Sequence, residues 1–236
     1  MNKKQIERSH LERFISNKNF SEDIVKIEDN ERPDFILKLK DNRLVSIEHT
    51  RLINPDLKKI EEHKDKIIKA AQKIFESKYG EKLYVLITFN NITLQSGKKN
   101  EDKYINHVFE LVEDVYLKNK GFEFHISSKM NRPAISSLID SIWIDNSWEF
   151  SNWQHFGAYL VEQIDNDWFR GVIDKKERNI KHYNEVFQEN WLLMVSDFGS
   201  KSSSNSFSGF DFSEIITKFD RVYLFSFRAD TITQVK

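Results

Sequence analysis

Features that define several classes of protein are missing from this sequence. There is no cysteine among its 236 residues, which excludes disulfide bonds and thiolate zinc sites. With three prolines, seven glycines, 39% hydrophobic and 31% charged residues, the composition excludes collagen-like and low-complexity chains and predicts an ordered globular protein. No apolar run approaches the roughly 18 residues that a membrane span needs, and residues 1–8 lack the apolar segment of a secretion signal. We therefore expect a cytoplasmic protein without a membrane partner.

The sequence also lacks an excess of charge of either sign. Its 36 basic residues oppose 37 acidic ones, giving a formal net charge of -1. The protein as a whole therefore offers no general attraction to nucleic acid, although a local basic patch or a metal site can still bind phosphates. Aromatic residues are abundant, at 13%, and predict a phenylalanine-rich core. Trp148, Trp153 and Trp168 either pack in such a core or stack on bases.

Hydrophobic periodicity predicts helices and strands that alternate along most of the chain. This alternation favours an α/β fold, with a mixed central β-sheet flanked by helices. Because no linker or repeat interrupts the pattern, a single domain over residues 1–236 is expected. Helices are predicted at residues 6–17, 57–77, 102–119, 174–187 and 212–219, and strands at 24–27, 34–39, 44–50, 83–89, 122–126, 191–195 and 222–227.

Two carboxylates on neighbouring strands are the first candidates for chemistry. Asp41 and Asn42 predict a tight turn, so the strands on either side form a hairpin that brings Asp34 close to Glu48. Two carboxylates at this distance repel each other unless a cation lies between them. Magnesium takes oxygen ligands and often binds one or two carboxylates, so the pair predicts either a magnesium site or a solvated acidic edge.

Two further charges fall on helix faces that are otherwise apolar. At about 100° per residue, Glu7 lies in the middle of the apolar face of helix 6–17, and Lys64 lies within the apolar stripe of helix 57–77. A charge on such a face needs a partner or water, because burying it alone costs several kcal/mol. Glu7 is either a salt-bridge partner or a site residue. Lys64 either extends its stem along the core edge or reaches a site.

Together these elements resemble the PD-(D/E)xK nuclease superfamily. The resemblance rests on a helix with an inward glutamate, a hairpin with Pro33-Asp34 and then Glu48-His49-Thr50, a long helix and a buried strand. It covers residues 1–126, and it implies a restriction-endonuclease-like core with residues 127–236 as a C-terminal α/β extension of the same domain. It further implies a magnesium- or manganese-dependent nuclease that acts on nucleic acid, with DNA as the expected substrate, and that often works as a homodimer.

The resemblance also assigns roles to residues of this sequence. Asp34 and Glu48 match the metal-binding acids, and Glu7 matches a helix glutamate that can complete the site. Thr50 stands where the motif lysine is expected, so either the site is inactive or the lysine has moved to the following helix, where Lys64 is the candidate. His49, next to Glu48, is a third candidate for binding the metal, or else a satisfied or solvated histidine.

Four residues are candidates for contacts with substrate. Thr50 has a hydroxyl that can orient a water molecule, and Gln72 lies one turn beyond Ile68 on the long helix. Lys176 and Lys181 belong to the most basic segment of the C-terminal half, which is either a solvated helix face or a surface for the phosphate backbone. The sequence thus leaves two hypotheses: a metal-dependent phosphodiester hydrolase, or an inactive nuclease-like fold that binds nucleic acid or protein.

Overall fold

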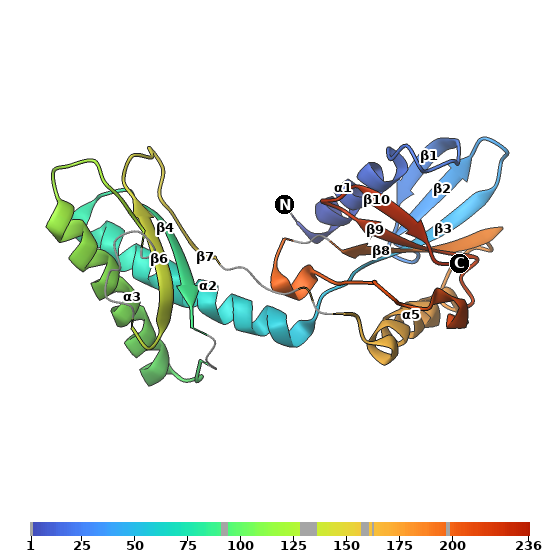
Figure 1. The fold of residues 1–236 in the computed structure, drawn as a ribbon. Coiled ribbons are helices and arrows are strands. Elements are labelled where there is room, and N and C mark those ends of the chain that lie inside the picture. The colour runs from blue at the N-terminus through green and yellow to red at the C-terminus, as the bar shows by residue number, and fades with distance from the viewer. Residues whose placement is uncertain (1, 91–93, 128–135, 157–160, 162, 197–198) are drawn as a thin grey trace. The chain divides into compact units, whose positions relative to one another are not determined.

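The chain forms two compact units, which are described separately here. The computed structural model describes residues 2–90, 94–127, 136–156, 161, 163–196 and 199–236 (Figure 1). Unit 1 comprises residues 1–54 and 160–236, and unit 2 comprises residues 55–159. Both contain a mixed β-sheet with helices packed on it, which confirms the predicted α/β class. The boundaries between the two units do not fall near residue 126, and a single domain stays a prediction.

Unit 1 is built on a six-stranded sheet in the order β1-β2-β3-β8-β9-β10. The pairs β1/β2, β2/β3 and β9/β10 are antiparallel, whereas β3/β8 and β8/β9 are parallel. The C-terminal strands therefore complete the sheet that the N-terminal hairpin begins. The elements are α1 (Lys3–Ile15), β1 (Ile24–Asp29), β2 (Phe35–Leu39), β3 (Leu44–Arg51), α5 (Asn166–Ile180), β8 (Glu189–Ser196), η1 (Lys201–Ser203), η2 (Phe212–Glu214), β9 (Arg221–Ser226) and β10 (Thr231–Gln234).

The two faces of this sheet are covered by different helices. Strand side chains alternate between faces, so Ile47 of β3 packs in the core beneath α1, with Phe14 of that helix. Leu192 of β8 belongs to the opposite core, which contains Phe169 and Ile173 of α5. Figure 1 shows α1 and α5 on opposite sides of the strands. Glu48 follows Ile47 and therefore points toward the α5 face.

Unit 2 contains a four-stranded sheet in the order β5-β6-β4-β7, with two helices on one face. Val85 and Ile87 of β4 point toward the helices, where Phe75 and Val112 join the same core. Among the described residues, no helix of either unit is long and apolar enough to cross a membrane. The elements are α2 (Pro55–Tyr79), β4 (Tyr84–Phe89), α3 (Lys98–Asn119), β5 (His125–Ser127), β6 (Ile139–Asp145) and β7 (Asn152–His155).

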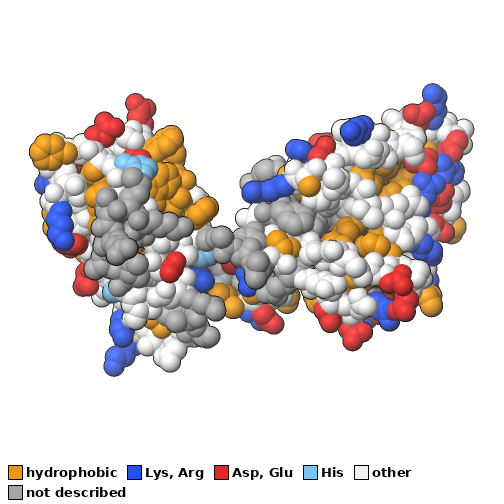
Figure 2. Space-filling model, in the orientation of Figure 1, with side chains coloured by type: hydrophobic (Ala, Val, Ile, Leu, Met, Phe, Trp, Pro, Cys, Tyr) orange, Lys and Arg blue, Asp and Glu red, His pale blue; other side chains and the backbone are white. Residues whose placement is uncertain are grey.

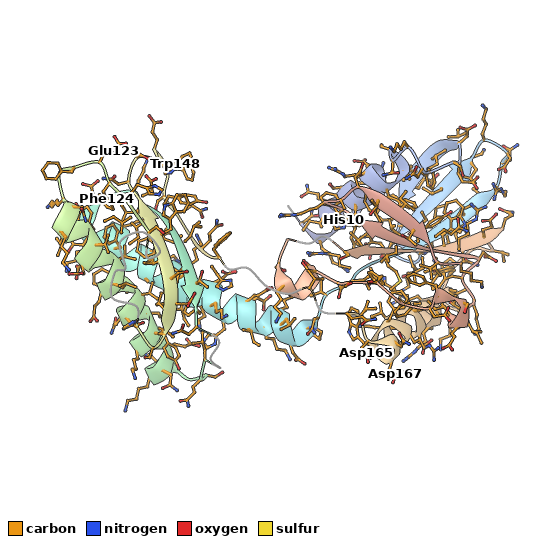
Figure 3. All side chains as sticks on the ribbon, viewed as in Figure 1. His10, Glu123, Phe124, Trp148, Asp165 and Asp167 are labelled. Atoms are coloured by element: carbon orange, nitrogen blue, oxygen red, sulfur yellow. The ribbon has the colours of Figure 1, made fainter. Side chains whose placement is uncertain are left out.

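Aromatic side chains gather on the face of this second sheet that turns away from α2 and α3. The ring centroids of Tyr84 and Trp143 lie 5.4 Å apart, and those of Trp148 and Phe150 lie 5.6 Å apart. Figure 2 shows hydrophobic side chains with a histidine beside them on this unit, and Figure 3 labels Trp148. We call Tyr84, Trp143, Trp148 and Phe150 the aromatic cluster. Trp148 is 47% exposed, so it does not lie in a buried core.

Two predicted helices differ from the observed elements. The helix predicted at residues 174–187 is α5, which begins eight residues earlier because the Asp165 side chain caps it by accepting a hydrogen bond from the Trp168 amide. The helix predicted at residues 212–219 is only the short 3-10 turn η2, where the Asp211 side chain accepts from the Ser213 amide.

Candidate functional site

The hairpin places Asp34 and Glu48 opposite each other on the α5 face of unit 1. Phe35 pairs with Ile47 across β2 and β3, so Asp34, which directly precedes Phe35, lies across from Glu48. The turn between the strands is closed at Asn42, which adopts a φ of 69°. The structure thus confirms the hairpin and the cross-strand closeness of the two acids. Such a pair requires a cation, a proton or hydrogen-bond donors between its oxygens.

The cation is the ammonium group of Lys176, which projects from α5. Its Nζ lies 3.0 Å from Asp34 Oδ2 and 2.9 Å from Glu48 Oε2. The Glu48 side chain is 2% exposed, whereas those of Asp34 and Lys176 are 15% and 21% exposed. The bridge therefore lies at the edge of the core, where solvent reaches Asp34 and Lys176. Burial alone would lower the pKa of Lys176, but the two carboxylates outweigh it and hold that pKa above its usual value of 10.5.

Two further residues beyond Lys176 fix both oxygens of Glu48. Asn179 Nδ2 donates to Oε2 over 3.1 Å, and the Tyr183 hydroxyl donates to Oε1 over 3.1 Å. Asn179 lies three residues after Lys176 on the same side of α5, and Tyr183 follows shortly after the helix ends at Ile180. Burial and the charge of Glu48 raise the pKa of Tyr183, so its hydroxyl stays protonated and remains a donor. Glu48 is consequently held in one orientation.

Backbone contacts hold Asp34 in place. The His49 amide donates to Asp34 Oδ2 over 2.7 Å, so the carboxylate closes the end of the hairpin ladder. Lys4 of α1 donates from Nζ to the carbonyl oxygens of Asn30 and Asp34, each over 2.6 Å. The N-terminal helix thereby anchors the segment that carries Asp34.

The side chains of Glu7 and His49 meet on the opposite face of the sheet, beneath α1. His49 Nδ1 lies 3.9 Å from Glu7 Oε1, and His49 Nε2 lies 3.0 Å from Nδ1 of His10, which Figure 3 labels on this helix. Burial and the nearby charges lower the pKa of His49 well below 6.5, so its ring is neutral. The ring of His49 thus turns away from Glu48, its neighbour in the strand, and does not join the two acids as predicted. Glu7 is buried, as its helical spacing predicted, and pairs with Lys3. It lies on the α1 face of the sheet, so it does not complete the site of Asp34 and Glu48 as predicted.

Two predicted site residues belong to unit 2 instead. Lys64 lies on α2 with its Nζ 5.6 Å from the centre of the Phe89 ring. Gln72 is buried on the same helix and donates to Glu76 Oε1 and to Ser151 Oγ. Within unit 1, the lysine that contacts Asp34 and Glu48 is Lys176, which the sequence suggested as a substrate contact.

The remaining candidates lie in unit 1 or are buried. Thr50 shares the α5 face of β3 with Glu48, because the two are separated by one residue. Lys181 is exposed at the C-terminal end of α5. Trp153 is fully buried in the core of unit 2, and Trp168 packs on the α5 core, so both have the structural role that the sequence allowed.

The sequence did contain a signal for Lys176. Phe169 and Ile173 form the buried stripe of α5, and Lys176 continues that stripe three residues later. It is therefore a charge on an apolar face, as Glu7 and Lys64 are. The signal was missed because the predicted helix began at residue 174, after both apolar residues.

The donor atoms of this site suit a hard divalent cation. Asp34 and Glu48 supply carboxylate oxygens, the ligands that magnesium prefers. Within the part of the chain that the structure describes, no group of three or more histidine and acidic residues is placed to hold a metal ion. A cation at this site would therefore complete its shell with water or phosphate. Comparison of the chain with protein-family models, curated proteins and solved structures finds no match.

Proposed function

We propose that this protein is a metal-dependent phosphodiester hydrolase of the PD-(D/E)xK type, with Asp34, Glu48 and Lys176 as its site. The observation that carries the proposal is the convergence of one lysine ammonium on two carboxylates of a hairpin, with both contacts within 3.0 Å. These are the residue types that the motif requires: two acids and a lysine.

The order of elements within unit 1 supports the same proposal. The resemblance requires a helix, a hairpin, a second helix and a buried strand. Within unit 1 these are α1, the β2-β3 hairpin, α5 and β8. Unit 2 is inserted in the sequence between the hairpin and α5. The helix that follows the hairpin inside the unit is thus α5. A motif lysine that has moved from Thr50 to the following helix is therefore Lys176.

Each residue of the site has a chemical role under this proposal. Asp34 and Glu48 would hold magnesium or manganese, and the bound ion would polarise a water molecule and neutralise charge on the phosphate. The two carboxylates raise the pKa of Lys176, and its ammonium group would stabilise negative charge on the phosphate. Asn179 and Tyr183 keep Glu48 oriented. Lys181, exposed at the end of α5, would meet the phosphate backbone of DNA, the first substrate to test.

A cleavage assay tests this proposal. Purified protein is incubated with magnesium or manganese and with single-stranded, duplex and branched DNA and RNA. We expect cleavage that Asp34→Asn and Glu48→Gln abolish, while Gln72→Ala, in unit 2, leaves it unchanged. Absence of cleavage of every substrate, or cleavage that survives both acid substitutions, would contradict the proposal. Sedimentation of the same preparation tests the homodimer that the resemblance implies.

The second candidate is an inactive nuclease-like fold that binds nucleic acid or another protein. It is favoured by the same ammonium group, since Lys176 already neutralises the two acids, and by Thr50 at the motif lysine position. Calorimetric titration with magnesium separates the two candidates. Binding that Glu48→Gln removes supports the enzyme, and absence of binding to the wild-type protein supports the inactive fold.

A further inference from the structure

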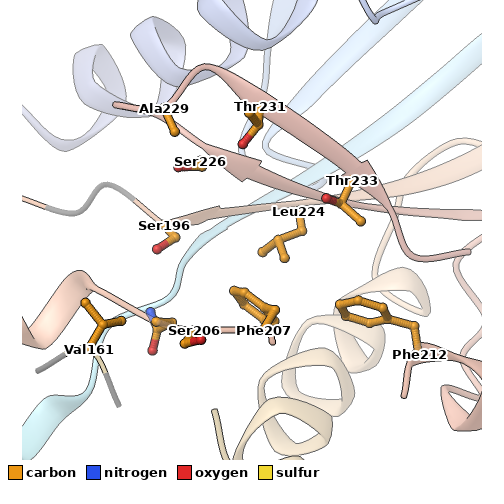
Figure 4. Close-up of a pocket in the computed structure, with 11 residues that line it drawn as sticks. Val161, Ser196, Ser206, Phe207, Phe212, Leu224, Ser226, Ala229, Thr231 and Thr233 are labelled. Atoms are coloured by element: carbon orange, nitrogen blue, oxygen red, sulfur yellow. The ribbon is translucent and has the colours of Figure 1, made fainter. Parts of the chain in front are cut away.

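A cavity of about 600 Å³ lies on the same sheet face of unit 1 as the acid pair (Figure 4). The register of the strands shows that the cavity and the acid pair share this face. Glu48 pairs with Leu192, and Leu192 pairs with Val222, so these residues share a face with Ser196 and Ser226 farther along the same strands. Thr231 of β10 pairs with Ser226 and extends the row.

The cavity is close enough to the acid pair for one substrate to reach both. Leu224, on its floor, lies two strands and two residues away from Glu48, a separation of roughly 12 Å at ~3.3 Å per residue and ~4.8 Å per strand. A few nucleotides of one extended strand span such a distance.

The chemistry of the lining suits an uncharged, flat ligand with hydrogen-bonding edges. None of its eleven described lining residues is charged. Hydroxyl groups of Ser196, Ser226 and Thr231 lie along the strand wall, while Phe207 and Phe212 form an aromatic wall. The two rings lie 6.1 Å apart at an angle of 28°. A nucleobase has a ring face for stacking and polar edges for the hydroxyls.

One hydroxyl points specifically to a ligand. Ser226 Oγ is buried and has no hydrogen-bond partner in the described part of the chain. By contrast, Ser196 Oγ in the same row donates to the Ser203 carbonyl oxygen over 2.9 Å. A buried polar group without a partner is costly, and a ligand that supplies one recovers that cost. Exposed Arg228, two residues beyond Ser226, adds a cation for phosphate near the β9-β10 turn.

From the geometry we infer that this cavity binds an unpaired nucleobase of a nucleic-acid strand whose backbone passes the Asp34-Glu48-Lys176 site. The inference rests on the proposed function and narrows it: the substrate contains single-stranded or extruded bases. A duplex with every base stacked cannot fill the cavity.

Binding without metal tests this inference separately from catalysis. Fluorescence anisotropy in the presence of a chelator compares a mixed-sequence single-stranded DNA with an abasic strand of the same length. The wild-type protein is expected to bind the abasic strand about tenfold more weakly, because stacking and base hydrogen bonds are lost. Ser226→Phe, which places an aromatic ring in the space proposed for the base, should bind both strands equally and as weakly as the wild type binds the abasic one.

Two matched variants guard against trivial explanations. Ser226→Ala removes only the unpartnered hydroxyl and should weaken base-dependent binding about fivefold while the protein melts at the wild-type temperature. Trp148→Ala alters the aromatic cluster of unit 2 and should leave binding unchanged. The inference is overturned if the wild-type protein binds both strands equally, or if only Trp148→Ala weakens binding. Cleavage without base-dependent binding would refute the role of the cavity but not the proposed function. Base-dependent binding without cleavage would refute the proposed function but not the role of the cavity.

Discussion

Replacement of Lys176 by methionine removes the cation that two carboxylates share, while it keeps most of the side-chain volume. Breaking a buried ion pair by removing one partner costs about 3–5 kcal/mol. Because the Lys176 side chain is 21% exposed, water can partly replace the ammonium group. We therefore expect a loss of about 2–4 kcal/mol in the free energy of unfolding, which corresponds to a fall of about 5–15 °C in melting temperature.

The same substitution should make the protein depend on metal for its stability. With the ammonium gone, Asp34 and Glu48 repel each other and bind a divalent cation more tightly. Magnesium at ten times its dissociation constant contributes about 1.4 kcal/mol to the folded state. Differential scanning fluorimetry with and without magnesium should therefore show a larger gain in melting temperature for Lys176→Met than for the wild-type protein.

The control is Lys64→Met, the same change at a lysine of unit 2. It should not increase the response of the melting temperature to magnesium. If Lys176→Met melts at the wild-type temperature and magnesium raises neither melting temperature, Lys176 does not stabilise the acid pair.

Three further predictions concern other groups. Tyr183→Phe should cost about 1–2 kcal/mol in unfolding free energy measured with urea, since Glu48 loses one charge-assisted hydrogen bond in a partly buried setting; an unchanged midpoint would contradict that contact. Burial and the charge of Lys64 lower the pKa of His155 to about 4. The unfolded chain therefore binds a proton at this histidine at a higher pH than the folded protein does, and the free energy of unfolding should fall as the pH drops from 6.5 toward 4. Lys64→Met should raise the His155 pKa in an NMR titration, and an unchanged pKa would refute the interaction. The fragment 55–159, which encloses its own core, should fold alone with a cooperative thermal transition by circular dichroism, and a featureless melt would show that it does not.

The parts of the site that local sequence determines could be predicted. Asp34 and Glu48 are separated by one short turn, and strand alternation places both on one face once the hairpin is recognised. Burial of Glu7 followed from helical spacing in the same way. In each case the deciding interactions lie within one element or one hairpin.

The rest depended on long-range topology that periodicity cannot give. Lys176 is 142 residues from Asp34 in the chain, and the residues of unit 2 separate the two in the sequence. The long helix after the hairpin has a strong apolar stripe, and nothing in that stripe shows that its core belongs to a separate unit. Lys64 was therefore assigned to the site on sequence order, whereas the parallel pairing of β3 with β8 brings α5 to the acids. His49 was assigned by its adjacency to Glu48, although neighbouring strand residues face opposite sides.

We propose that Lys176, together with Asp34 and Glu48, forms the catalytic site of a metal-dependent nuclease. Single-turnover cleavage of a single-stranded DNA in magnesium, compared among the wild-type protein, Lys176→Met and Lys64→Met, tests this proposal. We expect Lys176→Met to lower the rate by about 100-fold or more, because a charge that stabilises the transition state is lost, while Lys64→Met cleaves at the wild-type rate. Equal rates for the wild type and Lys176→Met, or a loss confined to Lys64→Met, would contradict it.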